Sequence, residues 1–236
     1  MSTTPDLLDR IDWTDVEHRL LRDGYALIDD VLDEERCAEF RAGYAASDAF
    51  RSRVLMERHN FGRGEYQYYA YPLPPLIAGL RSTAYAQLAP IANRWMKALR
   101  LTDRFPAAQQ EMLALCAEHG QERPTALILK YGVGDFNALH QDLYGEIAFP
   151  FQLTFFLSEP DADYTGGEFV LVEQRPRAQS RPEVLRPRRG AMLVFPNRYR
   201  PVVSKTGTYR TTFRHGVSLV RSGERYTLGI IFHDAK

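Results

Sequence analysis

The chain has 236 residues, of which 44% are hydrophobic and 25% charged, the composition of an ordinary globular protein. The two cysteines, Cys37 and Cys116, form no CxxC pattern, so we expect neither a disulfide framework nor a thiolate metal site. The N-terminus lacks the basic and apolar regions of a signal peptide, and no apolar run approaches the length of a membrane span. We therefore expect a cytoplasmic protein with no membrane segment.

The first part of the chain, residues 1–124, is predicted to be mostly helical. Apolar residues recur at a helical spacing in residues 12–23, 33–46, 76–99 and 106–119. Asp33 is placed as the N-cap of the second helix, and Pro90 should break or kink the third. Residues 25–28 are predicted to form a short strand.

The sequence of residues 53–71 has two apolar or aromatic runs separated by Gly62 and Gly64. This pattern predicts two strands joined by a loop that contains both glycines. The second strand is the aromatic run Tyr66-Gln67-Tyr68-Tyr69-Ala70-Tyr71. Its tyrosines can stack on a base or close over a substrate. Tyrosine is also a good strand former, so packing within a sheet is the alternative interpretation.

From Thr125 onward the pattern changes to short apolar runs separated by turn residues. The runs are residues 125–131, 140–143, 151–157, 168–173, 191–195, 208–216 and 225–233. This succession is typical of a double-stranded β-helix, a jelly-roll barrel like that of the cupins. We therefore predict a mainly β, α+β chain in which residues 1–124 pack on a barrel of residues 125–236 as one integrated domain.

The motif His140-Gln141-Asp142 lies within this β region. Its spacing predicts two ligands of a metal site. Side chains two apart on a strand project from one face, so His140 and Asp142 can present an imidazole and a carboxylate to one point. His215 is the candidate third ligand from a distant strand, and His233 is its competitor at the end of the chain. Two His and one carboxylate are typical of non-haem Fe(II) oxygenases. The same ligands also suit zinc, so a zinc-binding or non-catalytic barrel is an alternative.

Arg225 follows His215 by ten residues, and Ser222-Gly223 between them indicates a turn. We therefore expect His215 and Arg225 on adjacent antiparallel strands. Arg225 and Thr227 share one face of their strand, where a guanidinium and a hydroxyl can bind a small carboxylate.

This pattern resembles the Fe(II)- and 2-oxoglutarate-dependent dioxygenases. Their motif is His-x-Asp, a distant His, and about ten residues later an Arg that is followed two positions on by Ser or Thr. The resemblance implies that His140, Asp142 and His215 bind Fe(II), and that O2 is the second cosubstrate beside 2-oxoglutarate.

The same resemblance assigns the distal carboxylate of 2-oxoglutarate to Arg225 and Thr227, helped by Tyr131. The segments HQDLYGEIAFPFQLTFFLSEP, TGGEFVLVEQRPRAQSR and RHGVSLVRSGERYTLGIIFHDAK are similar to a bacterial group catalogued as oxygenases of damaged nucleic acid. The similarity covers roughly residues 125–236. On an N-methylated base, hydroxylation would release formaldehyde and the repaired base.

One departure favours another substrate class. The best-known alkylation-repair dioxygenases carry an Asn two residues before their active-site Tyr, where this chain has Leu129. The spacing of Arg225 instead resembles the prolyl-hydroxylase branch. A hydroxylase of a protein side chain or a small molecule is therefore the first alternative.

The charges bear on the same question. The net charge is zero, but residues 173–225 contain thirteen Lys and Arg against three acidic residues, a net charge of +10. Six arginines lie on one predicted exposed loop: Arg175, Arg177, Arg181, Arg186, Arg188 and Arg189. Such asymmetry is expected for a polyanionic partner such as DNA or RNA. Arginines on exposed strands also keep sheet edges soluble, which is the alternative interpretation.

Overall fold

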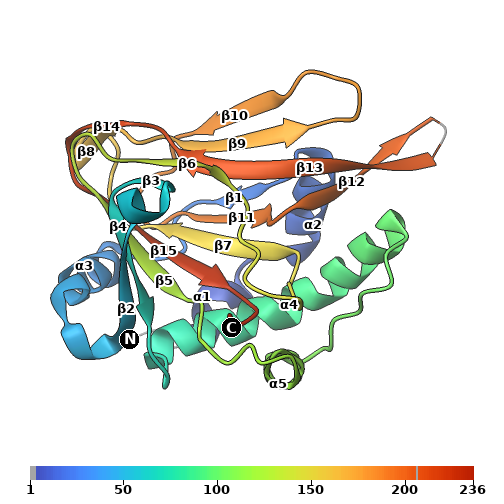
Figure 1. Cartoon of the computed structure of the whole chain (residues 1–236), viewed down its shortest axis with the longest axis horizontal. Coiled ribbons are helices and arrows are strands. Elements are labelled where there is room, and N and C mark those ends of the chain that lie inside the picture. The colour runs from blue at the N-terminus through green and yellow to red at the C-terminus, as the bar shows by residue number, and fades with distance from the viewer. Residues whose placement is uncertain (1–3, 206) are drawn as a thin grey trace.

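The computed structural model describes residues 4–205 and 207–236, within which two β-sheets lie one above the other (Figure 1). Within these residues the larger sheet has the strand order β1 (Ala26–Ile28), β11 (Met192–Pro196), β7 (Phe151–Phe156), β15 (Arg225–Ile231), β5 (Leu127–Tyr131), β4 (Glu65–Tyr69) and β2 (Phe50–Leu55). The smaller sheet has the order β10 (Arg181–Leu185), β9 (Phe169–Gln174), β13 (Gly207–Val217), β6 (Phe136–His140) and β3 (Gly62–Arg63), with β12 (Tyr199–Ser204) paired to β13. A separate pair joins β8 (Tyr164–Gly166) to β14 (Val220–Gly223). The predicted double-stranded β-helix is confirmed.

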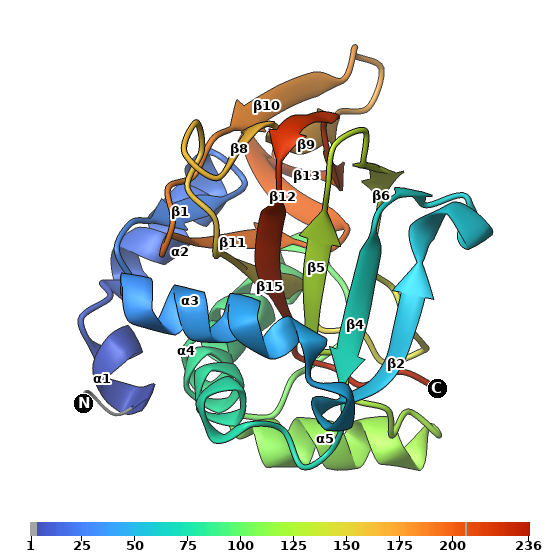
Figure 2. The same cartoon turned by 90° about the vertical axis from the view of Figure 1, so that its left-hand side faces the viewer.

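Helices cover the outer face of the larger sheet, as Figure 2 shows for α3, α4 and α5. The α-helices are α1 (Thr4–Asp9), α2 (Trp13–Arg22), α3 (Glu34–Ala42), α4 (Pro75–Leu99) and α5 (Gln109–Glu118). Asp33 caps α3 as predicted, because its side chain accepts a hydrogen bond from the backbone N–H of Arg36. No helix in the described part of the chain has both the length and the apolar character needed to cross a membrane.

Of the predicted break or kink at Pro90, the break is wrong, because α4 continues through this residue. Pro90 lies on the exposed side of the helix, while its neighbours Ala89 and Ile91 are buried. Packing of the apolar face stabilises the helix, and the carbonyl that loses its partner at Pro90 can bond to water.

Side chains alternate along the strands of the larger sheet, so that one face packs on the helices and the other faces the smaller sheet. Ile128, Leu153 and Leu228 point toward the helices and belong to the main hydrophobic core. The alternate residues of the same strands, such as Thr154 and Thr227, point into the space between the two sheets. This period of two therefore determines which side chains can form a site.

The two strands predicted within residues 53–71 are β2 and β4, and the structure pairs them with each other. β4 also pairs with β5, so the segment extends the larger sheet. The part of the chain before residue 125 therefore contributes strands as well as helices to the same architecture.

Three sequence predictions about strands are wrong. β6 ends at His140, so Asp142 lies in the loop that follows and not on a strand. His215 is on β13 of the smaller sheet and Arg225 is on β15 of the larger sheet, so they are not adjacent. Residues 181–185, predicted as part of a loop, form the edge strand β10, which pairs with residues 169–173 of β9.

Candidate metal centre and cosubstrate pocket

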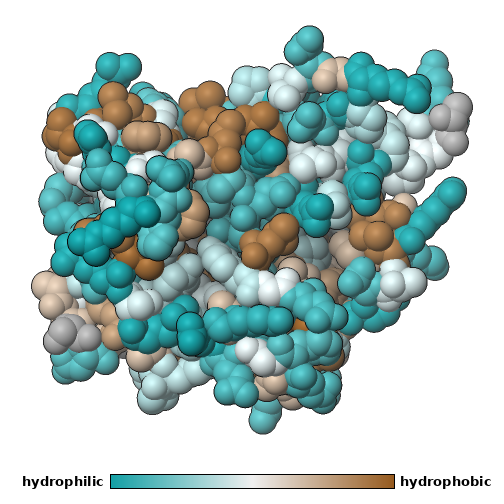
Figure 3. All heavy atoms as spheres, viewed as in Figure 1, coloured by the Kyte–Doolittle hydropathy of each residue, from teal (hydrophilic) through white to brown (hydrophobic). Residues whose placement is uncertain are grey.

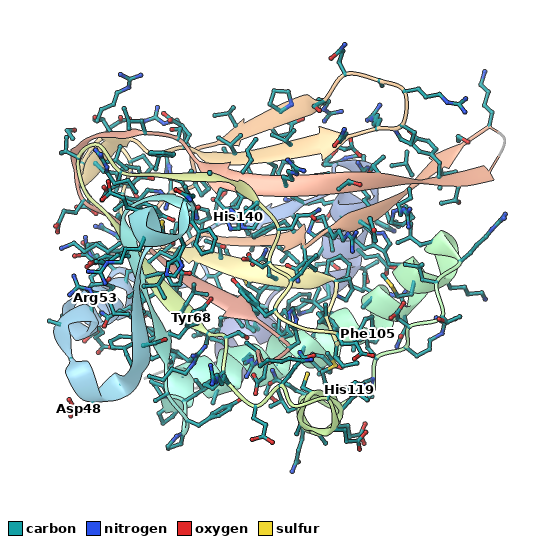
Figure 4. All side chains as sticks on the ribbon, in the orientation of Figure 1. Asp48, Arg53, Tyr68, Phe105, His119 and His140 are labelled. Carbon is teal, nitrogen blue, oxygen red and sulfur yellow. The ribbon has the colours of Figure 1, made fainter. Side chains whose placement is uncertain are left out.

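A cavity of about 160 Å³ lies between the two sheets. It is lined by Phe61, Tyr66, Leu127, Leu129, Tyr131, Asn137, His140, Gln141, Asp142, Tyr144, Gln152, Thr154, Phe169, His215, Val217, Arg225, Thr227, Gly229 and Ile231. All six residues that the sequence assigned to the metal and the cosubstrate are among them. Figure 4 shows His140 in the space between the sheets and Tyr68, on β4, below it.

His140, Asp142 and His215 form a group whose candidate ligand atoms lie within 4.8 Å of one another. β6 and β13 are antiparallel neighbours, and His215 lies opposite His140 in their register. The Nε2 atom of His215 is 3.3 Å from Oδ2 of Asp142, and Nε2 of His140 is 3.6 Å from Oδ1. Although Asp142 is not on the strand, its carboxylate therefore reaches both imidazoles. These three side chains can hold a metal ion.

The backbone sets the orientation of the His140 ring. Its Nδ1 atom lies 2.8 Å from the carbonyl oxygen of Ala138, so the proton is placed on Nδ1 and the lone pair on Nε2. Such a bond from the second ring nitrogen is common in metal-binding histidines. Gly216 allows β13 to approach β6 here, because a Cβ atom at this residue would lie 2.6 Å from the carbonyl oxygen of Asn137.

Asp142 is anionic in this environment. Burial would raise its pKa, but the hydrogen bond from His215, the charges of both imidazoles and the hydrogen bond from Tyr144 outweigh burial, so the pKa lies below its usual range. The Tyr144 hydroxyl donates to Oδ1 of Asp142 at 2.7 Å. Burial and the neighbouring His140 lower the pKa of His215, which favours the neutral ring that a metal requires.

Arg225 lies elsewhere in the cavity, on β15, and its side chain is only 1% exposed. Its guanidinium lies over the rings of Tyr131, Phe156 and Tyr164, at 5.4, 5.6 and 5.9 Å from their centroids. Its Nε and Nη1 are buried and have no hydrogen-bond partner in residues 4–205 and 207–236. Within the described residues no carboxylate pairs with Arg225, so an anion from outside the chain would remove the cost of this buried charge.

Thr227 and Tyr131 flank this guanidinium. Both are buried, and Tyr131 is the Cα partner of Arg225 across β15 and β5. Burial raises the pKa of Tyr131 to about 12, so its hydroxyl stays protonated and can donate. The same hydroxyl accepts a hydrogen bond from Asn137 at 3.2 Å. Arg225, Thr227 and Tyr131 therefore offer the cationic and hydroxyl donors that a carboxylate needs.

His233 is not part of the metal-binding group. Its Nδ1 accepts a hydrogen bond from the backbone N–H of Phe149 at 3.1 Å, and the ring is fully buried. The structure thus brings His215, and not its competitor His233, to His140.

Tyr144 and Gln152 were not among the site residues predicted from the sequence. For Gln152 a signal was present, because Gln152 and Thr154 are two polar residues in alternation within the apolar run of residues 149–157. In a strand with one face on a core, such alternation indicates that the other face meets something polar.

Residues 64–235 match a protein family described as an oxygenase catalysing oxidative methylation of damaged DNA. The chain belongs to this family. An uncharacterized protein of Mycobacterium tuberculosis is 51% identical over 164 residues, which are 70% of each chain.

Solved structures of oxygenases share the fold. A prolyl-4-hydroxylase of Pseudomonas putida has a TM-score of 0.56 at 16% identity and covers 95% of this chain and 99% of its own. A prolyl hydroxylase of Trichoplax adhaerens has a TM-score of 0.58 at 16% identity, over 94% of this chain and 89% of its own. A 2-oxoglutarate-Fe(II) oxygenase of Burkholderia pseudomallei has a TM-score of 0.52 at 16% identity, with coverages of 96% and 93%.

The family, the fold and the His-Asp-His group agree with one another. The protein is an oxygenase of this family. The fold that it shares with solved 2-oxoglutarate-Fe(II) oxygenases and its His-Asp-His group support Fe(II), 2-oxoglutarate and O2 as its cofactors.

Proposed function

We propose that this dioxygenase removes methyl groups oxidatively from alkylated nucleic acid, with His140, Asp142 and His215 as the iron ligands and Arg225 as the 2-oxoglutarate anchor. The observation that carries the proposal is one cavity that holds both a His-Asp-His group and a buried guanidinium without an anion. The family description, which names damaged DNA, supports the substrate class.

The residues of the cavity fit the cosubstrate. Arg225 would bind the distal carboxylate through the N–H groups of its guanidinium, and Thr227 and Tyr131 would donate to the same carboxylate. A zinc-binding barrel has no need for such an anchor, so the unpaired guanidinium favours the oxygenase over this alternative.

The iron would be held by Nε2 of His140, Nε2 of His215 and a carboxylate oxygen of Asp142. The chemistry supplied at that position is the oxidation of a substrate C–H bond to an alcohol, coupled to the conversion of 2-oxoglutarate to succinate and CO2. The Tyr144 hydroxyl donates to Oδ1 of Asp142 and so holds the carboxylate with Oδ2 toward Nε2 of His215. On an N-methyl group the hydroxylated carbon leaves as formaldehyde and the ring nitrogen recovers its hydrogen.

The arginines first predicted as a phosphate-binding loop are largely paired with carboxylates. Arg175 pairs with Glu173, Arg181 with Glu183, Arg186 with Asp161, and Arg189 with Glu34. Most of their charge is thus compensated on the protein surface, which weakens the case for this loop as the main contact.

A second basic surface, formed by Arg198, Arg210 and Arg214, offers a better candidate. Arg198 and Arg210 both lie over the ring of Tyr199, each at 4.4 Å from its centroid. All three arginines are exposed, and within the described residues none pairs with a carboxylate. We include this β12–β13 surface in the proposal as the contact for the phosphate backbone.

The test is turnover of 2-oxoglutarate to succinate with three kinds of substrate: single-stranded oligonucleotides that carry one N-methylated base, proline-containing peptides, and free amino acids. We expect succinate and an equal amount of formaldehyde with the methylated oligonucleotides alone. Hydroxylated peptide or amino acid without formaldehyde would instead support the alternative of a protein or small-molecule hydroxylase.

A further inference from the structure

The cavity has a second polar feature that neither the metal nor the 2-oxoglutarate anchor uses. Gln152 on β7 is 3% exposed and lines the same cavity, and its buried Nε2 finds no hydrogen-bond partner among the residues that the structure describes. Gln152 and Thr154 project from the same face of β7 and both line the cavity, whereas Leu153 between them projects from the other face and packs into the core. A buried amide donor without a partner is costly, so such groups usually await a ligand.

2-Oxoglutarate cannot satisfy this amide. Gln152 lies beside Ile231 in the register of β7 and β15, and Ile231 is at the opposite end of β15 from Arg225. The six residue steps from 225 to 231 span roughly 20 Å of strand. Side chains stand roughly perpendicular to a sheet, so most of this separation remains between the guanidinium and the amide. A five-carbon diacid is about as long as two extended residues, roughly 7 Å, and is too short to contact both.

The cavity walls between Arg225 and Gln152 are aromatic and apolar. Tyr66 and Tyr144 line the cavity, and Tyr68 contacts both edge to face, with centroid distances of 5.3 and 6.3 Å. Leu127 and Ile231 pack in the same cluster and line the cavity toward Gln152. Flat, mostly apolar walls with one planar amide suit a flat heterocycle whose edge carries hydrogen-bonding groups.

Gly229 keeps this end of the cavity open. It lines the cavity between Arg225 and Ile231 on β15, and a Cβ atom there would lie 2.7 Å from Cδ2 of Leu127. A side chain at residue 229 would therefore displace Leu127 or narrow the space in front of Thr154, its Cα partner on β7.

We propose that the Gln152 carboxamide, between walls formed by Tyr66 and Tyr144, binds the polar edge of a nucleobase that is turned out of its strand, and so selects the base that is oxidised. This inference rests on the proposed function. A carboxamide presents a donor and an acceptor side by side in one plane, which is how Gln pairs with a base edge. Enzymes that act on bases commonly read a turned-out base by hydrogen bonds to its edge and stacking on side chains.

The experiment compares the parent with Gln152→Met, which keeps the length of the side chain but removes both hydrogen-bonding groups. Gln174→Met is the matched control, because Gln174 is exposed on β9. The substrates are single-stranded oligonucleotides with one N-methylated base. We expect kcat/KM to fall about 10- to 100-fold in Gln152→Met, since a bidentate pair with a base discriminates by about this much, and to stay within twofold in Gln174→Met.

Binding of 2-oxoglutarate, measured with Mn(II) in place of iron, provides a second readout. We expect its dissociation constant in Gln152→Met to stay within about twofold of the parent. A loss of 2-oxoglutarate binding equal to the loss of kcat/KM would overturn the inference, because Gln152 would then serve the cosubstrate. Gln152→Asn tests the same idea with a variant that stays polar, because its amide ends one methylene short of the base and kcat/KM should again fall.

The two proposals fail differently. If the parent oxidises methylated oligonucleotides and both Gln152 variants match it in kcat/KM, this inference alone is wrong. If the parent oxidises no methylated oligonucleotide, the proposed function is wrong and the base-binding role falls with it.

Discussion

Arg225 is a buried cation whose guanidinium is only partly supplied with hydrogen-bond partners by the described residues. Its charge is buried among three aromatic rings, and two of its nitrogens have no partner. Aromatic faces attract a cation but accept no ordinary hydrogen bonds in the plane of the guanidinium. The environment is therefore suited to an anion with two oxygens, such as a carboxylate.

Replacing Arg225 by Ala should weaken 2-oxoglutarate binding strongly. Loss of one partner of a buried charged hydrogen-bonded pair costs about 2–5 kcal/mol, so the dissociation constant should rise by about two orders of magnitude. Titration of 2-oxoglutarate in the presence of Mn(II) measures this change. Arg221→Ala is the control, because Arg221 is exposed on the neighbouring β14. An unchanged constant in Arg225→Ala would place the cosubstrate elsewhere.

The metal ligands give a second prediction at this scale. His215→Ala should lose bound iron and 2-oxoglutarate turnover, because only two ligands of the group remain. His233→Ala should keep the metal, since His233 lies outside the group that could bind it. Metal content after dialysis against Fe(II) under anaerobic conditions distinguishes the two. Iron retained by His215→Ala and lost by His233→Ala would reverse the assignment.

At the scale of elements, the smaller sheet carries both candidate histidine ligands, His140 and His215, and the β12–β13 basic surface. On β13, His215 points into the cavity, whereas Arg210, Thr212 and Arg214 alternate with buried residues and lie on the outer face. One strand can therefore serve the metal on one side and a polyanion on the other. Figure 3 shows that hydrophobic groups on the viewed face are separate patches among hydrophilic ones, as expected for a surface that meets a polar partner.

Salt dependence separates the two basic surfaces. Replacing Arg198, Arg210 and Arg214 together by Ala should reduce the slope of log binding constant against log salt by about two to three units on DNA, if each contacts one phosphate. Replacing Arg186, Arg188 and Arg189 should change it less, because two of these three already pair with carboxylates. The slopes follow from oligonucleotide binding between low and physiological salt. The opposite ranking would restore the loop as the phosphate contact.

At the scale of the whole molecule, the chain after β15 is bound into the core. The backbone carbonyl of His233 accepts a hydrogen bond from Thr125, and Asp234 pairs with Arg81 of α4 at 2.7 Å. Both members of this ion pair are almost fully buried. The end of the chain thus ties the larger sheet to α4, and its contacts influence the stability of the whole fold.

Buried His233 predicts how this stability depends on pH. Burial and the nearby charge of Arg81 lower its pKa to about 4 from the usual 6.5. As pH falls from 6.5 to 4, the unfolded chain takes up a proton at His233 that the folded chain does not. The stability that neutral His233 contributes to the folded state is therefore complete above pH 6.5 and is lost progressively below it. The loss is about 3 kcal/mol in the free energy of unfolding by pH 4.

Denaturant unfolding at several pH values tests this dependence. His233→Asn is the comparison, because an Asn can replace the Nδ1 acceptor for Phe149 without titrating. The free energy of unfolding should fall less between pH 6.5 and 4 in this variant than in the parent, because one titrating group has been removed. Equal slopes in the parent and the variant would show that His233 is not the titrating residue.

The sequence by itself determined the features that depend on spacing within one strand or loop. His140 and Asp142 are close in the chain, Arg225 and Thr227 share one face of β15, and the alternation in residues 149–157 separates Gln152 from the core. The pleat of a strand and the short reach of a loop enforce these relations in almost any tertiary context. For this reason the identity of the candidate ligands and the type of fold could be predicted.

Tertiary structure alone decided the relations between strands that are distant in sequence. The Ser222-Gly223 turn suggested that His215 and Arg225 are neighbours, yet their strands pair in opposite sheets and meet only across the cavity. The ion pairs of the arginines could not be predicted either, because Arg186 pairs with Asp161 and Arg189 with Glu34, which are distant from them in the sequence. Which sheet a strand joins depends on long-range hydrogen bonding and on the core it covers, and local periodicity contains no record of either.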